Sequence, residues 1–347
     1  MKFHKVKLVV LTLLLPMMLF GCEHVHDNDI ATWKIVETNG PTMRAEYAMA
    51  YDKSQMKIIA FGGRTGFPDF NNVNETWSFD YNASTWSNLH PELQPPWRSS
   101  HTMVFDSRRN NILLFGGSDF SQAFNDLWTY DHALNTWVEI QTKNTPQARQ
   151  MHGLVYVSKQ DVLLLFGGRR VGGGASFNDT WLYHFDTNQW ELLSTAHHPP
   201  VTDHVNLAYS STDDMVLLFT EPDARGASPD SGRQQSTWVY DFTTNDWRSL
   251  LPVDFPLTNH SNLEYDTHHN QFVLFGNLQN GRSMVTWRFN TTENNWMNIT
   301  PYVFPEIPFT HFPVIEHDDM VYIDDQNVFI QYGGCCSDTT LELSLSK

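Results

Sequence analysis

Cysteine and positive charge are both scarce in this sequence. Only 3 of the 347 residues are cysteine, and 22 lysines and arginines stand against 39 acidic residues, which gives a net charge of −17. This balance argues against nucleic acid or an anionic membrane surface as the main partner. Cys335 and Cys336 are adjacent, so they cannot join distant parts of the chain. We expect either a vicinal disulfide or two free thiols.

An apolar run long enough to cross a bilayer is also absent. The run from Leu8 to Phe20 follows three lysines and is shorter than the roughly 20 residues of a membrane-spanning helix, but it suits a signal peptide. It leads into Leu19-Phe20-Gly21-Cys22, which resembles the lipobox of bacterial lipoproteins, although Phe20 departs from the usual small or β-branched residue. The alternative is an ordinary signal peptide with an incidental cysteine.

The lipobox resemblance implies a signal peptide over residues 1–21 and an acylated Cys22 that anchors the protein without a transmembrane helix. Glu23 next to it implies sorting to the outer membrane, so we expect a lipid-anchored protein of the bacterial cell envelope that faces the periplasm or the cell surface. Residues 22–31 are polar and are predicted to be a flexible tether. Residues 32–347 then form the folded domain.

Helical periodicity is absent after the signal segment, and a unit of about 50 residues recurs instead. Its second tryptophan falls at Trp33, Trp86, Trp137, Trp190, Trp247 and Trp296. Its first falls at Trp77, Trp128, Trp181, Trp238 and Trp287, with Leu341 in the sixth place. A Gly-Gly position precedes the first tryptophan and falls at Gly62-Gly63, Gly116-Gly117, Gly167-Gly168, Thr220-Glu221, Gly276-Asn277 and Gly333-Gly334. The spacing persists where the glycines are lost.

Each unit is predicted to hold four strands, here called a to d. Strand a ends at an aromatic residue, strand b is a continuous apolar run, strand c carries the first tryptophan, and strand d carries the second. Continuous apolar runs of this length suit strands that are covered on both faces. Four antiparallel strands per unit, repeated radially, predict an all-β, six-bladed β-propeller. A lone strand d at Thr32 to Ile35 is expected to complete the last blade, whose strand c is Thr339 to Leu343, and to close the ring.

The units resemble kelch repeats. The resemblance rests on Arg98-x-x-His101, Phe115-Gly116-Gly117, Asn125-Asp126-x-Trp128-x-Tyr130-Asp131 and Thr136-Trp137, and it extends from about Thr32 to Leu343. It is strong in units one to three, whereas units four to six are degenerate at the glycines. The kelch motif is structural, so the resemblance implies a propeller and says little about activity.

The b–c connections are the predicted binding loops, because variable loops on a rigid repeat scaffold commonly carry function. They hold Arg64, Arg169, Arg170, Arg225, Arg233 and Arg282, with Phe120 and Phe177 as apolar neighbours. Arginine offers a planar bidentate fork, so this face is predicted to bind an anionic glycan or peptide. Arg44, Arg98 and Arg149 precede strand a on the same face, where the kelch pattern implies a structural role as the alternative.

Histidines near the start of strand a are expected at the channel mouth: His101, His152, His204, His260 and His317. Imidazoles on consecutive blades could converge on a metal, but histidine here also resembles a structural kelch position, and we predict no metal or other cofactor. Cys335-Cys336 follows the last Gly-Gly and is placed on the same face.

Two functions from different classes fit these features. The first is a monomeric, non-catalytic binding propeller whose partner is a protein or an anionic glycan. The alternative is a sugar-acting enzyme that resembles the kelch-type N-acetylneuraminate epimerases (mutarotases), whose carboxylated sugar would suit an arginine-rich mouth. Copper radical oxidases related to galactose oxidase are disfavoured, because they need a Tyr–Cys crosslink and a further domain. No nucleophile–base motif or phosphate loop occurs, so we favour binding over catalysis.

Overall fold

The structure is a computed structural model that describes residues 30–36, 38–66, 69–172, 176–202, 204–221, 235–278, 284–301, 318–334 and 337–346. The regular elements of these residues are all β-strands, as the sequence predicts. Within the described ranges there is no helix that is long and apolar enough to cross a membrane. The predicted signal peptide, the lipobox and Cys22 lie outside the described residues, as do Cys335 and Cys336.

Six sheets have four antiparallel strands each, and they are numbered here along the chain. Sheet 1 consists of β3 (Ala48–Asp52), β4 (Lys57–Phe61), β7 (Thr76–Asp80) and β8 (Thr85–Asn88). Sheet 2 consists of β9 (Thr102–Asp106), β10 (Asn111–Phe115), β11 (Leu127–Asp131) and β12 (Thr136–Ile140). Sheet 3 consists of β13 (Gly153–Val157), β14 (Val162–Phe166), β15 (Thr180–His184) and β16 (Gln189–Leu192).

The other three sheets repeat this order, and most strands of sheets 4 and 5 are longer. Sheet 4 consists of β17 (Val205–Ser210), β18 (Met215–Thr220), β19 (Ser236–Asp241) and β20 (Asp246–Leu250). Sheet 5 consists of β21 (Thr258–Asp266), β22 (Gln271–Leu278), β23 (Met284–Asn290) and β24 (Asn295–Asn298). Sheet 6 consists of β25 (Asp319–Ile323), β26 (Val328–Tyr332), β27 (Thr340–Leu345) and β1 (Ala31–Val36).

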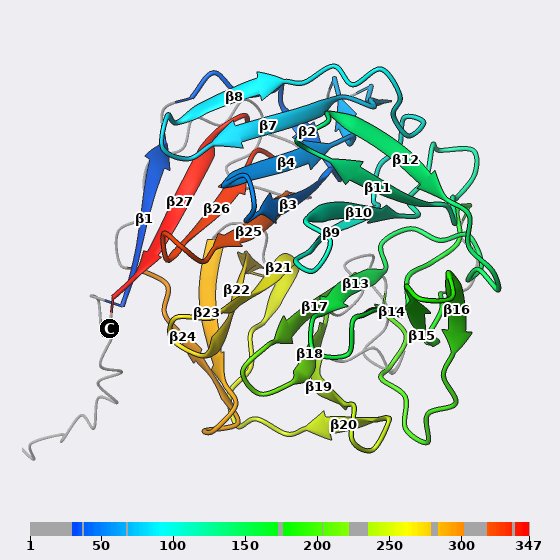
Figure 1. Ribbon diagram of the computed structural model, residues 1–347. Helices are drawn as coiled ribbons and strands as arrows, with labels where there is room; N and C mark the ends of the chain where they lie inside the picture. Colours follow the sequence, from blue (N-terminus) through cyan, green and yellow to red (C-terminus); the bar gives the residue numbers. More distant parts are fainter. Residues whose placement is uncertain are drawn as a thin grey trace, which may run out of the picture.

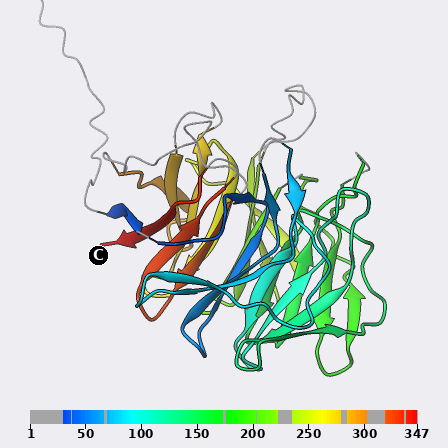
Figure 2. The same ribbon diagram turned by 90° about the horizontal axis from the view of Figure 1, so that it is seen from above.

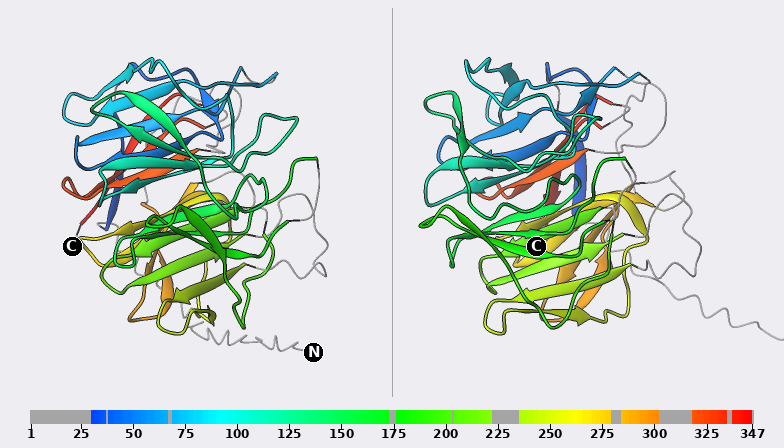
Figure 3. Two further views of the ribbon diagram at one scale, coloured as in Figure 1. Left: turned by 45° about the vertical axis from the view of Figure 1, so that its right-hand side comes forward. Right: turned by 90° about the vertical axis from the view of Figure 1, so that its right-hand side faces the viewer.

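Sheet 6 joins the two ends of the chain. β1 pairs antiparallel with β27, with Trp33 opposite Leu343, and the two strands lie side by side in both views of Figure 3. This is the pairing that the lone N-terminal strand predicts. β1 is one residue longer at each end than expected from the sequence, whereas β27 begins one residue later and ends two residues later. A further three-stranded sheet, β2 (Arg44–Ala45), β5 (Arg64–Thr65) and β6 (Asn71–Asn72), lies outside the repeat pattern.

The sheets are arranged around a common centre. Figure 1 shows β3, β9, β13, β17, β21 and β25 near the middle. The strands with the second tryptophan lie at the periphery: β1, β8, β12, β16, β20 and β24. Each inner strand lies against the inner strand of the next sheet, and β25 lies against β3. In side view the strands run between two faces (Figure 2). The loop face carries connections such as 116–126, and the turn face carries tight turns such as 132–135.

The apolar strands are buried on both sides because sheets pack face to face. Ile59 of sheet 1 and Leu114 of sheet 2 belong to one core cluster, and both are fully buried. The next cluster joins Leu113 to Leu163 of sheet 3. Adjacent residues of a strand therefore point into different inter-sheet layers, which explains why strand b has no polar alternation.

The second tryptophan of each unit bridges two sheets. The Nε1–H group of Trp137 donates to Thr76 Oγ1 of the preceding sheet at 3.0 Å, and that of Trp247 donates to Thr180 Oγ1 at 2.8 Å. Equivalent bonds join Trp33, Trp86 and Trp296 to Thr286, Thr340 and Thr237. Trp190 has no partner for Nε1 among the described residues, because the threonine position of sheet 2 is occupied by Leu127. The recurring Thr and Trp thus hold neighbouring sheets together.

Candidate binding site at the channel mouth

A cavity of about 210 Å³ opens between the inner strands on the loop face. Residues from all six four-stranded sheets line it, and we call it the channel mouth. Its rim includes Glu46, Ser100 and Met151, whose φ angles of 54°, 56° and 56° are left-handed. The Ser100 N–H donates to the Glu46 carbonyl at 2.7 Å, and the Met151 N–H donates to the Ser100 carbonyl at 2.9 Å. These backbone bonds hold the rim in its strained conformation.

Four of the predicted histidines line this cavity: His101, His152, His204 and His260. His101 and His152 are buried and pack edge-on against Phe61 and Phe115. Burial, with Arg149 nearby, lowers the pKa of His152 to about 3, and burial together with Arg98 lowers the pKa of His101. Both rings are therefore neutral at physiological pH, which suits structural packing.

The other mouth histidines contact each other. The rings of His204 and His260 are 5.0 Å apart at an interplanar angle of 85°. No group of three or more His, Cys, Asp or Glu side chains in the described ranges is placed to hold a metal ion. His317 lies outside those ranges.

The arginines that precede strand a have the structural role that the kelch pattern implies, and they do not face a ligand site. Arg44, Arg98 and Arg149 are at most 1% exposed. Arg98 donates to the Gly116 carbonyl at 3.0 Å and forms a bidentate pair with Asp126 at 2.6 and 2.7 Å. Trp128, the first tryptophan of this unit, donates to the same carboxylate at 2.7 Å. Four residues of the kelch motif, Arg98, Gly116, Asp126 and Trp128, are thus joined in one hydrogen-bond network.

The three described arginines of the b–c loops, Arg64, Arg169 and Arg170, do not line the channel mouth. None of the five described residues of this predicted set, Arg64, Arg169, Arg170, Phe120 and Phe177, lines the cavity. Arg64 donates to the Glu46 carboxylate, and Arg170 donates to the Gln147 side chain and lies 5.4 Å from the Phe177 ring centroid. Arg169 joins the backbone of Gln150 at 2.9 and 3.0 Å. Arg225, Arg233 and Arg282 lie outside the described residues.

The Arg64 guanidinium lies against two phenylalanine rings beside the mouth, and one of these rings, that of Phe120, is exposed. Its guanidinium carbon lies 5.0 Å from the ring centroid of Phe70 and 5.7 Å from that of Phe120, within the range of a cation–π contact. Phe120 is 48% exposed and has a left-handed φ of 72°. We call Arg64, Phe70 and Phe120 the Arg64 platform. It brings one predicted arginine and one predicted phenylalanine together across sheets 1 and 2.

Carboxylates line the mouth, and sequence reasoning missed them. Glu46, Glu264, Asp318 and Asp319 belong to its wall. Burial raises the pKa of Asp319 to about 7 although its carboxylate accepts hydrogen bonds from the Met49 and Met320 amides at 2.6 and 2.9 Å. Burial and then the Asp319 charge raise the pKa of Glu264 well above its ordinary value. A signal was present, since Glu264 stands where the other units carry alanine or valine.

Glu221 bridges sheets 4 and 5 where the Gly-Gly is lost. It is buried, and its carboxylate accepts hydrogen bonds from the backbone N–H and the hydroxyl of Ser261. Burial raises its pKa to about 7. In sheet 2 the corresponding Gly117 has a φ of 91°, and a Cβ there would lie 2.8 Å from the Ser99 carbonyl oxygen. In sheet 4 neither Thr220 nor Glu221 has a positive φ, so the backbone there follows a different path from that at Gly116-Gly117.

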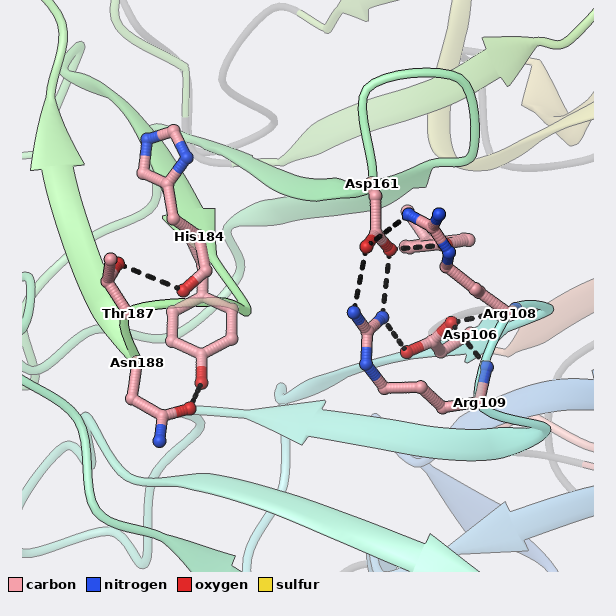
Figure 4. A network of polar contacts seen from close by, with 9 residues as sticks. Asp106, Arg108, Arg109, Asp161, His184, Thr187 and Asn188 are labelled. Carbon is pink, nitrogen blue, oxygen red and sulfur yellow. Dashed lines mark hydrogen bonds and ion pairs between the residues drawn. The ribbon is translucent and has the colours of Figure 1, made fainter.

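The turn face carries a different charge network (Figure 4). Arg109 pairs with Asp106 of its own turn and Asp161 of sheet 3, and Arg108 reaches Asp161 as well. The Arg109 guanidinium carbon lies 3.8 Å from the Phe185 ring centroid. These groups neutralise one another and connect two sheets, so they form a structural contact.

Radially arranged four-stranded sheets with a repeat of about 50 residues define this protein as a β-propeller of the repeat class. A family model described as the KLHDC2/KLHL20/DRC7 Kelch-repeats domain matches residues 21–220 and 144–334. The chain belongs to the kelch-repeat family, as the sequence motifs indicate.

Curated relatives include Kelch domain-containing protein 10 of Rattus norvegicus, Mus musculus and Homo sapiens. Each is 27% identical over 190 residues, which is 52% of this chain and 45%, 42% and 41% of the respective relatives. The match therefore spans less than half the length of those proteins.

Proposed function

We propose that this protein is a binding module: six four-stranded sheets form a closed ring, and a protein partner docks on the loop face over the channel mouth. The contact between β25 and β3 and the pairing of β1 with β27 support the closed ring. The kelch relationship supports an interaction role over catalysis. The sialate epimerase-like alternative has no support from the described arginines of the b–c loops, Arg64, Arg169 and Arg170, because each of these already has a partner within the protein.

The main support for a docking site on the loop face is the Arg64 platform. Phe120 is about half exposed, yet its loop is ordered by Asp119, whose carboxylate accepts hydrogen bonds from the Ser121 and Gln122 amides at 3.0 and 2.9 Å. The Asn72 amide also donates to the Ser118 carbonyl at 3.3 Å. A rigid aromatic ring beside an arginine is typical of residues that dominate protein interfaces, because little entropy is lost on binding.

A protein partner also fits the charges better than the anionic glycan predicted from sequence. The Glu46 carboxylate neutralises Arg64, and the lining of the channel mouth contains four carboxylates and neither lysine nor arginine. An anionic ligand would meet like charge at the mouth, whereas a protein segment can place its own polar groups to suit the wall.

We also propose that the protein is anchored through acylated Cys22 in a bacterial cell envelope. β1 begins at Ala31, which pairs with Leu345 at the turn-face end of sheet 6. A lipid anchor preceding Ala31 would therefore tether the turn face and leave the loop face turned away from the bilayer, accessible to a partner.

The docking proposal is tested by selecting peptides from a random display library on the purified protein and measuring their binding to variants. Phe120→Ala is expected to weaken selected peptides about tenfold or more, the range of an interface hot spot. Leu134→Ala is the matched control, because Leu134 is a 72% exposed apolar residue at the turn-face end of the same sheet. Failure to select any binder, or binders that Phe120→Ala leaves unaffected, would contradict the proposal.

A further inference from the structure

Glu264 breaks the repeat at a position that is otherwise apolar. It immediately precedes the aromatic residue at the end of strand a. The corresponding residues of the other units are Ala50, Val104, Val155, Ala208 and Val321. All five belong to the hydrophobic clusters or pack against them. A carboxylate in such a place costs stability unless a partner compensates for its lost hydration.

In the part of the chain that the structure describes, the groups that act on Glu264 include no positive charge. Glu264 is partly buried in β21. The amide of Tyr265 donates a hydrogen bond to its carboxylate, and the charge of Asp319 repels it. It lines both the channel mouth and a second cavity of about 420 Å³ at the turn face. Glu264 therefore lies within the channel, where a ligand that enters from the mouth can reach it.

Among the residues that the structure describes, no unpaired lysine or arginine lines the cavities beside Glu264. Asp319 and Asp318 approach from the start of β25, and Glu46 is already paired with Arg64. The remaining titratable groups of the mouth are Tyr47 and the four histidines, of which His101 and His152 are neutral. Lys53 lines only the turn-face cavity, and it is paired with Asp324.

We propose that the channel mouth binds one cationic group, the ammonium or guanidinium of a basic side chain on the docking protein, with Glu264 and Asp319 as its counter-charges. The volume of about 210 Å³ is below the roughly 300–1,000 Å³ of typical small-molecule sites and suits a single side chain. This inference rests on the proposed function, because the docking protein supplies the cation. Asp319 adds a carboxylate that its two backbone donors already orient.

The binding of a cation here is coupled to protons. Burial favours the neutral forms of Glu264 and Asp319, so a cation must displace their protons. Affinity is therefore expected to rise with pH and to be about tenfold or more weaker at pH 5 than at pH 8. A neutral ligand would show no such dependence.

The test measures binding of n-butylguanidinium and n-butylammonium to the full-length protein by calorimetry or NMR, with n-butylurea as the uncharged analogue. The two cations should bind about tenfold or more tightly than the urea, and their ratio shows whether the site prefers the arginine or the lysine head group. Glu264→Val, which copies sheets 2, 3 and 6, should weaken both cations about tenfold or more. Asp324→Asn at the turn-face cavity is the control and should leave binding unchanged.

Thermal unfolding separates a binding role from a structural one. Removing an uncompensated carboxylate and filling the position with valine should raise the melting temperature of Glu264→Val by about 2 °C or more. A lower melting temperature with unchanged cation binding would overturn the inference and make Glu264 a structural residue. Glu264→Gln, which keeps the shape, should lose cation binding as well, and full retention would also overturn the proposal.

The outcomes distinguish this inference from the proposed function. If selected peptides need Phe120 but bind Glu264→Val as they bind the wild type, the cation site is wrong and the docking surface stands. If the small cations need Glu264 but no selected peptide needs Phe120, the cation site stands and the docking surface is wrong.

Discussion

The hydrogen bond between Trp247 and Thr180 offers a sharp test of how neighbouring sheets are held together. The Nε1–H group of Trp247 donates to Thr180 Oγ1 at 2.8 Å, and the two residues are only 1% and 2% exposed. Thr180→Val keeps the shape and the strand propensity of the side chain but removes the acceptor. The indole N–H is then buried without a partner, because water cannot reach it.

The expected loss follows from the cost of an unsatisfied buried donor. A typical net hydrogen bond contributes about 1 kcal/mol, and a donor left buried and unpaired costs about 1–3 kcal/mol. We therefore expect Thr180→Val to lower the free energy of unfolding by about 1–3 kcal/mol. Valine is slightly more apolar than threonine, so the gain from its burial brings the net value toward the lower end of this range.

Guanidinium chloride unfolding, followed by tryptophan fluorescence, measures this change. Thr129→Val is the matched control: Thr129 lies on the equivalent strand of sheet 2 and is only partly buried, so its replacement should change stability by less than about 0.5 kcal/mol. Equal stability of Thr180→Val and the wild type would refute the argument that these bonds connect the sheets. Trp190, which already lacks a partner in the described residues, shows that the fold tolerates one such loss.

Two further predictions concern buried carboxylates and the glycine pairs. Because burial raises the pKa of Asp319 and Glu221 from about 4 in the unfolded chain to about 7, their contribution to stability is present at pH 4 and is lost as the pH rises to 7. Asp319→Asn should therefore flatten the decline in melting temperature between pH 5 and pH 8, and an unchanged slope would contradict the raised pKa. Gly117→Ala should abolish or severely reduce soluble folded protein, since its Cβ would lie 2.8 Å from a backbone oxygen. Gly172→Ala, where nothing lies within 4 Å, should cost only the roughly 1–2 kcal/mol of a left-handed alanine, and equal effects of the two would refute the steric argument.

Much of the fold could be predicted because its signals are local. Apolar runs such as Ile112 to Phe115 and turns such as Asp106 to Asn111 lie within a single hairpin, so their pattern reports the strands directly. The spacing of the tryptophans identifies the repeat even where Thr220-Glu221 replaces the glycines. The pairing of β1 with β27 could also be inferred, because the first and last units are each incomplete in the sequence.

The candidate site was harder to predict because each charge is defined by its neighbours in space. Arg64 looked available for an anion, but Glu46, 18 residues earlier, neutralises it through the fold of the three-stranded sheet. Arg98 was open to two interpretations, and only its full burial against Asp126 decided between them. Glu264 carries no local signal of its own, because only comparison with Ala50, Val104 and their counterparts shows that it replaces an apolar residue.

By itself, the sequence determined that this protein is a kelch-repeat chain of β-strands, since strand, turn and repeat each depend on residues that are close in the chain. The tertiary structure decided which polar groups are already satisfied. It showed that the arginines recurring before strand a are buried and hydrogen-bonded within the protein. It also showed that the exposed Phe120 lies against Arg64 and that Glu264 has no counter-ion in the described channel. Those outcomes depend on contacts between sheets, where a residue meets partners from other repeats, and no local pattern specifies them.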